Sequence, residues 1–156
     1  NNEDYLKYVG CNLDQVLKFL DYLEYKNIQT TLRQVIIPTL NDSLENIYKE
    51  QGIALANEVI KEGKNVSSPK EIFDAMNDYI LDGMPCDRVN EIILNEENKI
   101  IWQKRIDVHK DIWDEVGCDV NYFYNLRNAW IESFVSSVNT NFKYIDENTK
   151  KSIERI

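Results

Sequence analysis

Residues 88–110 read RVNEIILNEENKIIWQKRIDVHK. Two apolar, β-branched runs flank the polar group at 95–98, a pattern typical of two antiparallel strands joined by a four-residue loop. In the second run the side chains at 100, 102, 104, 106 and 108 should share one mostly apolar face, because strand side chains alternate. A lone hairpin is only marginally stable, so helices before and after it should cover that face.

The opposite face of the second run is more polar, and the chain's only histidine, His109, comes at its end. Histidine is the side chain best suited to act as a general base near neutral pH. Arg105 falls on the same face and could hold a substrate carboxylate through two hydrogen bonds, while Glu91 or Asn90 on the first strand could join them. The alternative interpretation is a solvated strand face that ends in an incidental histidine.

Helix signals surround the hairpin on both sides. A capping pattern at 42–45 should open a helix that runs to about residue 62, and Ser68-Pro69-Lys70-Glu71 is the clearest helix start, with Gly83 as its expected end. A short helix at 110–117 should turn Ile112 inward. The apolar positions of the first of these helices are less regular than in one continuous helix, and Gly52 marks either a break or a point of close packing; these positions are Leu44, Ile47, Leu55, Val59 and Ile60.

Asp119 should cap the next helix, whose apolar stripe is interrupted by Arg127. We expect the stem of Arg127 to pack along the stripe and its head to reach water or a carboxylate. The alternating segment 141–145 predicts a third antiparallel strand, whereas 148–156 is too short to assign. The expected fold is therefore α+β and mostly helical, with a small antiparallel sheet made by the hairpin 88–108 and the strand 141–145.

The composition limits the partners of the chain. Acidic residues outnumber basic ones by 27 to 18, giving a formal net charge of -9 and a pI near 4.7. Such a chain repels phosphate backbones and anionic membranes, so nucleic acid and membrane partners are not expected. No apolar run is long enough for a membrane span and the polar start is unlike a signal peptide, which predicts a cytoplasmic protein. The sequence does not indicate an oligomeric state.

The three cysteines, Cys11, Cys86 and Cys118, are widely separated and form no Cys-x-x-Cys pair. This spacing argues against a disulfide framework and against a self-contained zinc or iron–sulfur site, so we expect no metal and no cofactor. Each cysteine is most simply a small packing residue. Cys86 and Cys118 are also candidate nucleophiles, for the reason given by the second resemblance below.

The first part of the chain predicts a helix from Asn12 to about Asn27, a buried strand that ends at Pro38, and a further helix. The runs 8–14, 16–20 and 31–42 resemble the later part of pyruvate formate-lyase activating enzymes, which are radical S-adenosylmethionine proteins built on a partial α/β barrel. The resemblance covers residues 1–48 and implies that Arg33 lies near a S-adenosylmethionine site. The alternative for Arg33 is a strand-edge charge paired with a carboxylate. The family's three-cysteine cluster motif is absent from this sequence.

Residues 49–156 resemble a second family. The segments 88–91, 101–102, 112–113 and 138–142 are similar to the C-terminal region of the L-2-amino-thiazoline-4-carboxylic acid hydrolases, which open a small cyclic amidine. The resemblance implies a hydrolase of carbon–nitrogen bonds and makes Cys86 and Cys118 possible nucleophiles. Where that family tends to carry a cysteine after the second hairpin strand, this chain has His109.

Three functional hypotheses follow. The first is a hydrolase that acts on a carbon–nitrogen bond of a small carboxylate-bearing substrate, with His109 as base and Arg105 as anchor. The second is a ligand-binding or interaction domain without catalysis. The third is a truncated or fused piece of a glycyl-radical-enzyme activating enzyme, inactive alone. On this basis residues 1–48 and 49–156 would be separate segments.

Overall fold

The structure is a computed structural model that describes residues 37–156 apart from 84, 85 and 116. The described residues group into two compact units. The larger unit consists of Glu45–Val108 and Tyr122–Ile156, and the described residues of the smaller one are 37–44 and 109–121 except 116. Most of the predicted helix–strand–helix start lies outside the described residues.

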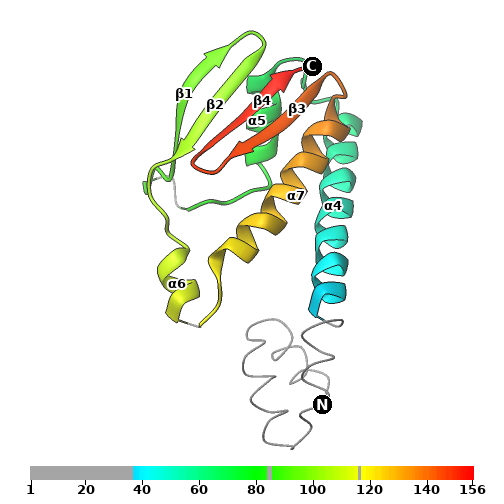
Figure 1. Ribbon diagram of the computed structural model, residues 1–156. Coiled ribbons are helices and arrows are strands. Elements are labelled where there is room, and N and C mark those ends of the chain that lie inside the picture. The colour runs from blue at the N-terminus through cyan, green and yellow to red at the C-terminus, as the bar shows by residue number, and fades with distance from the viewer. Residues whose placement is uncertain (1–36, 84–85, 116) are drawn as a thin grey trace, which may run out of the picture. The chain divides into compact units, whose positions relative to one another are not determined.

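Helices and strands follow the chain in the order of their labels in Figure 1. The four strands form one antiparallel sheet in the order β1-β2-β4-β3. This confirms the predicted α+β class with a small antiparallel sheet. The elements are α4 (Ile37–Lys61), α5 (Pro69–Asn77), β1 (Asn90–Glu96), β2 (Lys99–Lys104), α6 (Lys110–Glu115), α7 (Val120–Val138), β3 (Phe142–Glu147) and β4 (Lys150–Arg155).

The strand β4, which the sequence pattern did not predict, lies inside the sheet. Ile153 on β4 pairs with Ile100 on β2 and with Tyr144 on β3, so these three side chains share one face. The predicted strand at 141–145 corresponds to β3, which turns directly into β4. Asn148 takes a φ of 61° in that turn, a left-handed conformation that asparagine tolerates in tight hairpins.

The predicted hairpin exists as β1 and β2, but its turn is tighter than predicted because Glu96 already pairs with Lys99. The strand β2 also ends early, at Lys104. Beyond it the Arg105 N–H donates to the backbone oxygen of Val89 at 2.7 Å. Ile106, predicted on the apolar face, is instead 45% exposed. The buried face of β2 therefore consists of Ile100 and Trp102 alone.

The helix α4 begins at Ile37, before the capping pattern at 42–45 where we had placed its start. Ile37 was predicted to end a strand and belongs to the helix. Pro38 lies in the first turn, where backbone N–H groups have no partner within the helix and the missing N–H of proline costs nothing. The helix is continuous to Lys61, and Gly63 follows with a φ of 72°, as expected for a C-terminal cap.

Gly52 sets the distance between α4 and α7, which lie side by side (Figure 1). A Cβ at this position would stand 2.5 Å from the backbone oxygen of Trp130 on α7. Because no side chain fits there, the two helices approach closely. From residue 42 onward the buried residues of α4 are Gly52, Ala56 and Val59, whereas Ile47 and Ile60 are 57% and 48% exposed.

The helix α5 starts as predicted. Ser68 accepts a hydrogen bond from the Glu71 N–H, and the Glu71 carboxylate accepts one from the Ser68 N–H, which completes a capping box. The helix ends at Asn77 and not at Gly83. Gly83 is needed for another reason, since a Cβ there would lie 2.8 Å from the side chain of Val89.

The smaller unit contains α6, which buries none of its side chains. Ile112, predicted to point inward, is 61% exposed. Gly117 follows α6 with a φ of 71°, and the Asp119 carboxylate accepts a hydrogen bond from the Asn121 N–H at 2.9 Å. The predicted end of α6 and the predicted cap of α7 are thus confirmed.

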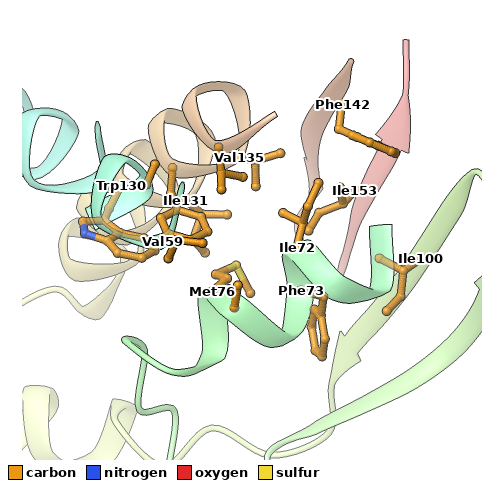
Figure 2. Close-up of a cluster of buried hydrophobic side chains, with 14 of the residues drawn as sticks. Val59, Ile72, Phe73, Met76, Ile100, Trp130, Ile131, Val135, Phe142 and Ile153 are labelled. Atoms are coloured by element: carbon orange, nitrogen blue, oxygen red, sulfur yellow. The ribbon is translucent and has the colours of Figure 1, made fainter. Parts of the chain in front are cut away.

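The hydrophobic core joins the helices of the larger unit to one face of the sheet. Figure 2 shows side chains from α4, α5, α7 and the strands meeting in one cluster. The Phe73 ring of α5 lies 4.9 Å from the Trp102 ring of β2, and Trp130 stacks on Phe134 within α7 at 5.0 Å. The fully buried members include Val59, Ile72, Ile100, Phe134, Val135 and Ile153.

Candidate functional site

His109 does not lie on the polar face of the hairpin, where the sequence pattern placed it. The strand β2 ends at Lys104, and His109 belongs to the smaller compact unit. Its backbone oxygen accepts a hydrogen bond from the Trp113 N–H at 3.0 Å at the start of α6. Cys118 lies in the same unit, and its N–H donates to the backbone oxygen of Trp113 at 2.9 Å.

Three of the other predicted site residues lie in the larger unit. The Arg105 guanidinium and the Glu91 carboxylate lie 3.9 Å apart, and both side chains are about half exposed. Cys86 is an exposed free thiol, 3.9 Å from the carboxylate of Asp87. The structure thus brings Arg105 and Glu91 together, but it places them in a different unit from His109 and Cys118. Arg33 lies outside the described residues.

A network of charged and polar side chains joins α7 to the segment after α5 and to β1. Its centre is Arg127 on α7, whose guanidinium donates to the Asp82 carboxylate and, at 2.9 Å, to the backbone oxygen of Leu81. The side chain of Arg127 is only 13% exposed. The Asn90 amide on β1 donates to the other oxygen of Asp82. Of the two predicted environments for the head of Arg127, water or a carboxylate, the structure shows the carboxylate of Asp82.

Lys104, the last residue of β2, belongs to the same network. Its ammonium group lies 3.3 Å from the centre of the Tyr124 ring and 3.7 Å from the Asp107 carboxylate. The Tyr124 hydroxyl donates to Asp107 at 2.6 Å. Burial lowers the pKa of Lys104, whereas burial and the hydrogen bond to Asp107 raise the pKa of Tyr124.

Asn128 on α7 connects a third group of charges to the sheet. Its side-chain oxygen accepts hydrogen bonds from Lys151 at 2.5 Å and from the Tyr144 hydroxyl at 2.9 Å, and its amide donates to Asp146. Burial lowers the pKa of Lys151 and raises the pKa of Tyr144. Every polar group in this cluster is paired, so it fixes α7 on the sheet.

An open groove of about 450 Å³ lies beside this cluster, between α7 and β3. Its acidic members are Glu45, Glu132 and Asp146. Two of these carboxylates are already in contact with lysines, since Glu45 pairs with Lys49 at 2.6 Å and Asp146 lies 3.9 Å from Lys151. The third, Glu132, has no ion pair with a residue that the structure describes.

A second pocket, of about 320 Å³, lies between the end of α5 and the start of β1, and we refer to it as the Arg88 pocket. Ile80, Leu81 and Val89 provide apolar walls. Its polar lining consists of Arg88, Asp82, Asn77 and Asn90. A concave site with apolar walls and few polar groups is the usual form of a small-molecule site.

Arg88 is the lining residue whose charge is uncompensated. Its side chain makes no hydrogen bond or ion pair with any residue that the structure describes. Asp82, the one acid of the lining, is held by Arg127 and Asn90 instead. Arg88 also has a φ of 49°, in the left-handed region that is unfavourable for residues other than glycine and asparagine. Arg88 thus adds to the lining a positive charge that no described residue pairs with.

The sequence pattern identified Arg105 as the carboxylate anchor and overlooked Arg88. Nothing in the alternation of residues 88–110 marks Arg88, because it comes before β1 and its left-handed backbone is not visible in a periodic pattern. A usable signal was the polar segment 86–88 between an expected helix and a strand, since binding residues often lie in such loops.

Comparison of the chain with protein-family models, curated proteins and solved structures gives no significant match. Within the described part of the chain, no three His, Cys, Asp or Glu side chains gather in a way that could hold a metal ion. No helix among residues 37–156, as far as they are described, is long and apolar enough to cross a membrane.

Proposed function

We propose that the larger unit is a binding domain for a small molecule that carries a carboxylate, and that the Arg88 pocket holds this molecule. The observation that carries the proposal is the uncompensated Arg88 guanidinium in a pocket whose one acid is already paired with Arg127. A guanidinium binds a carboxylate through two parallel hydrogen bonds, and it keeps its charge at any physiological pH.

The size of the pocket supports a small ligand. A volume of about 320 Å³ is at the lower end of the range for ligand pockets. Its apolar walls would hold an aliphatic or ring group of a few carbon atoms, while the carboxylate remains at Arg88. The proposed ligand is still the small carboxylate-bearing molecule expected from the sequence, but Arg88 binds its carboxylate in place of Arg105.

The hydrolase activity suggested by the sequence stays a prediction. Such an activity requires a nucleophile and a base within hydrogen-bond reach of each other. Of the candidates, Cys86 is in the larger unit, whereas His109 and Cys118 are in the smaller one. The lining of the Arg88 pocket, by contrast, directly supports binding. The fused activating-enzyme hypothesis concerns residues 1–48 and also stays a prediction.

The experiment is a calorimetric titration of the whole chain with butanoate, 4-methylpentanoate and benzoate. Each acid is compared with its neutral primary amide, which has the same shape and no charge. We expect at least one acid to bind, and its amide to bind roughly tenfold more weakly or not at all, because a charged hydrogen bond is lost.

Two variants locate the binding. Arg88→Gln should weaken the binding of the acid roughly tenfold, whereas Arg105→Gln should leave it unchanged, since Arg105 is paired with Glu91 and does not line the pocket. The proposal is wrong if none of the acids binds, if acid and amide bind equally, or if Arg88→Gln binds the acid as well as the original chain.

A further inference from the structure

We infer that the ligand of the Arg88 pocket is an α-amino acid with an aliphatic side chain, in its zwitterionic form. This inference rests on the proposed function and makes it more specific. It follows from the second charged residue of the pocket lining, Asp82, and from the two amides beside it.

Arg88 and Asp82 line the same pocket without forming an ion pair with each other. A pocket with a separate cation and anion is complementary to a molecule that carries both charges. A plain carboxylate would use Arg88 and would bring no donor for the remaining acceptor positions of Asp82. An amino acid would instead place its ammonium group near Asp82, where opposite charges attract.

Asp82 has the capacity for a further hydrogen bond. Its carboxylate has about four acceptor positions, and the described contacts, from Arg127 and Asn90, occupy one on each oxygen. Arg127 and Asn90 also hold Asp82 in place, so the carboxylate is in position before a ligand arrives. An ammonium group has three donors and could use the remaining positions.

The two amides of the lining add further acceptors. The Asn77 amide donates to the backbone oxygen of Phe73 at 2.8 Å, and the Asn90 amide donates to Asp82. The amide nitrogens are engaged in these contacts, and no described residue donates a hydrogen bond to the side-chain oxygen of Asn77 or Asn90. Acceptors favour a ligand that brings N–H donors, as an amino acid does.

The apolar lining indicates the side chain of the ligand. Ile80, Leu81 and Val89 are the apolar members of the lining, and Leu81 is 72% exposed. Covering such a side chain with an aliphatic group removes apolar surface from water and favours binding. The combination of guanidinium, carboxylate and aliphatic wall fits an amino acid such as valine, leucine or isoleucine.

The test compares matched ligands on the same unaltered chain. Valine, leucine and isoleucine are each titrated alongside the acid that lacks the amino group and the amine that lacks the carboxylate, for leucine 4-methylpentanoate and 3-methylbutylamine. We expect at least one amino acid to bind roughly tenfold more tightly than either of its partners, because each partner loses one charged hydrogen bond.

The outcomes separate this inference from the proposed function. If an acid binds through Arg88 as tightly as its amino acid, the ligand is a plain carboxylate, and this inference alone is overturned. If an amine binds as tightly as the amino acid, or if nothing binds, both are overturned. Because the ligand is changed and not Asp82, the result does not depend on whether an Asp82 variant folds.

A second measurement uses Asn77→Asp, which adds a carboxylate to the lining at an exposed position. The added charge should strengthen the binding of the amino acid relative to that of the acid, roughly threefold or more. A variant that binds both ligands with an unchanged ratio would contradict the placement of the ammonium group in this pocket.

Discussion

Arg127 in the middle of α7 is bound to Asp82 in the loop after α5, and it also donates to the backbone oxygen of Leu81 at 2.9 Å. Asp82 and Leu81 both line the Arg88 pocket. One largely buried side chain therefore connects a core helix to the wall of the proposed binding site. The stability of the fold and the shape of the pocket depend on the same contact.

Replacing Arg127 should test this connection. Arg127→Gln leaves Asp82 as a partly buried carboxylate without its cation, and should lower the free energy of unfolding by about 2 kcal/mol. Urea denaturation measures the change. Arg105→Gln is the matched control, because the pair of Arg105 with Glu91 is half exposed and should contribute less than about 0.5 kcal/mol. If both substitutions lowered the free energy of unfolding equally, the expectation that the more buried ion pair contributes more would be wrong.

Arg88 should show a conflict between stability and binding. Arg88→Gly removes the cost of a left-handed backbone at a residue with a side chain, so the free energy of unfolding should rise or stay within about 1 kcal/mol of its original value. The same substitution should abolish the binding of the acid. Thermal unfolding and calorimetry on one preparation check both effects. A variant that is clearly less stable would show that Arg88 has a structural role.

Gly52→Ala should destabilise the chain although alanine is the better helix former. The added Cβ would stand 2.5 Å from the Trp130 oxygen, and both helices would have to shift. We expect a loss of about 1–3 kcal/mol in the free energy of unfolding by chemical denaturation. Gln51→Ala is the control, because position 51 is exposed in the same helix and should change little.

The stability should decrease in alkaline solution, partly because of Tyr144. Burial, and then the charge of Asp146, raises its pKa above the ordinary 10.0. Above pH 10 the unfolded chain loses this proton while the folded chain keeps it, so the unfolded state is favoured as the pH rises. Lys151 has the opposite effect on stability. Because burial lowers its pKa, its contribution to the free energy of unfolding rises with pH up to the ordinary lysine pKa of 10.5 and is constant above it.

The measurement for Tyr144 is urea denaturation between pH 10.5 and 11.5. Tyr144→Phe should make the loss of stability less steep by about 1.4 kcal/mol per pH unit, the effect of one proton. At pH 7 the slope with pH should be the same in both proteins. An unchanged slope in the alkaline range would show that the Tyr144 hydroxyl ionises in the folded state.

The contribution of β4 to stability can be measured with substitutions at two isoleucines that are close together in the sequence. Ile153 is fully buried in the middle of the sheet, and Ile153→Ala should lower the free energy of unfolding by about 2–5 kcal/mol. Ile156 is 79% exposed, and Ile156→Ala should change it by less than about 0.5 kcal/mol. Chemical denaturation of both variants distinguishes the two positions.

Much of the fold was predictable because local patterns determine it. The capping box at Ser68, the glycines at 63 and 117 and the hairpin β1–β2 all depend on residues near them in sequence. β4 was not predictable in this way. Its residues KKSIER contain one apolar side chain, Ile153, and the strand forms because β2 and β3 bind it from both sides.

The candidate site was less predictable than the fold. The alternation of residues 100–109 was extended too far, because the point where β2 leaves the ladder depends on backbone bonds to Thr149 and Val89. For this reason the alternation predicts His109 on the same strand face as Arg105, although β2 ends at Lys104. Asp82 and Arg127 are 45 residues apart in sequence, so no local pattern could have paired them. Only the preference of Arg127 for a carboxylate could be read from the sequence.

The central position of β4 also has a consequence for the order of events on the ribosome. The hairpin β1–β2 and the strand β3 share no ladder and are joined only through β4. During synthesis, residues 90–147 emerge from the exit tunnel before the strand that joins them. Until β4 follows, the edge of β2 that faces away from β1 and an edge of β3 lack the strand that pairs with both, and unpaired edges of this kind can pair with another nascent chain.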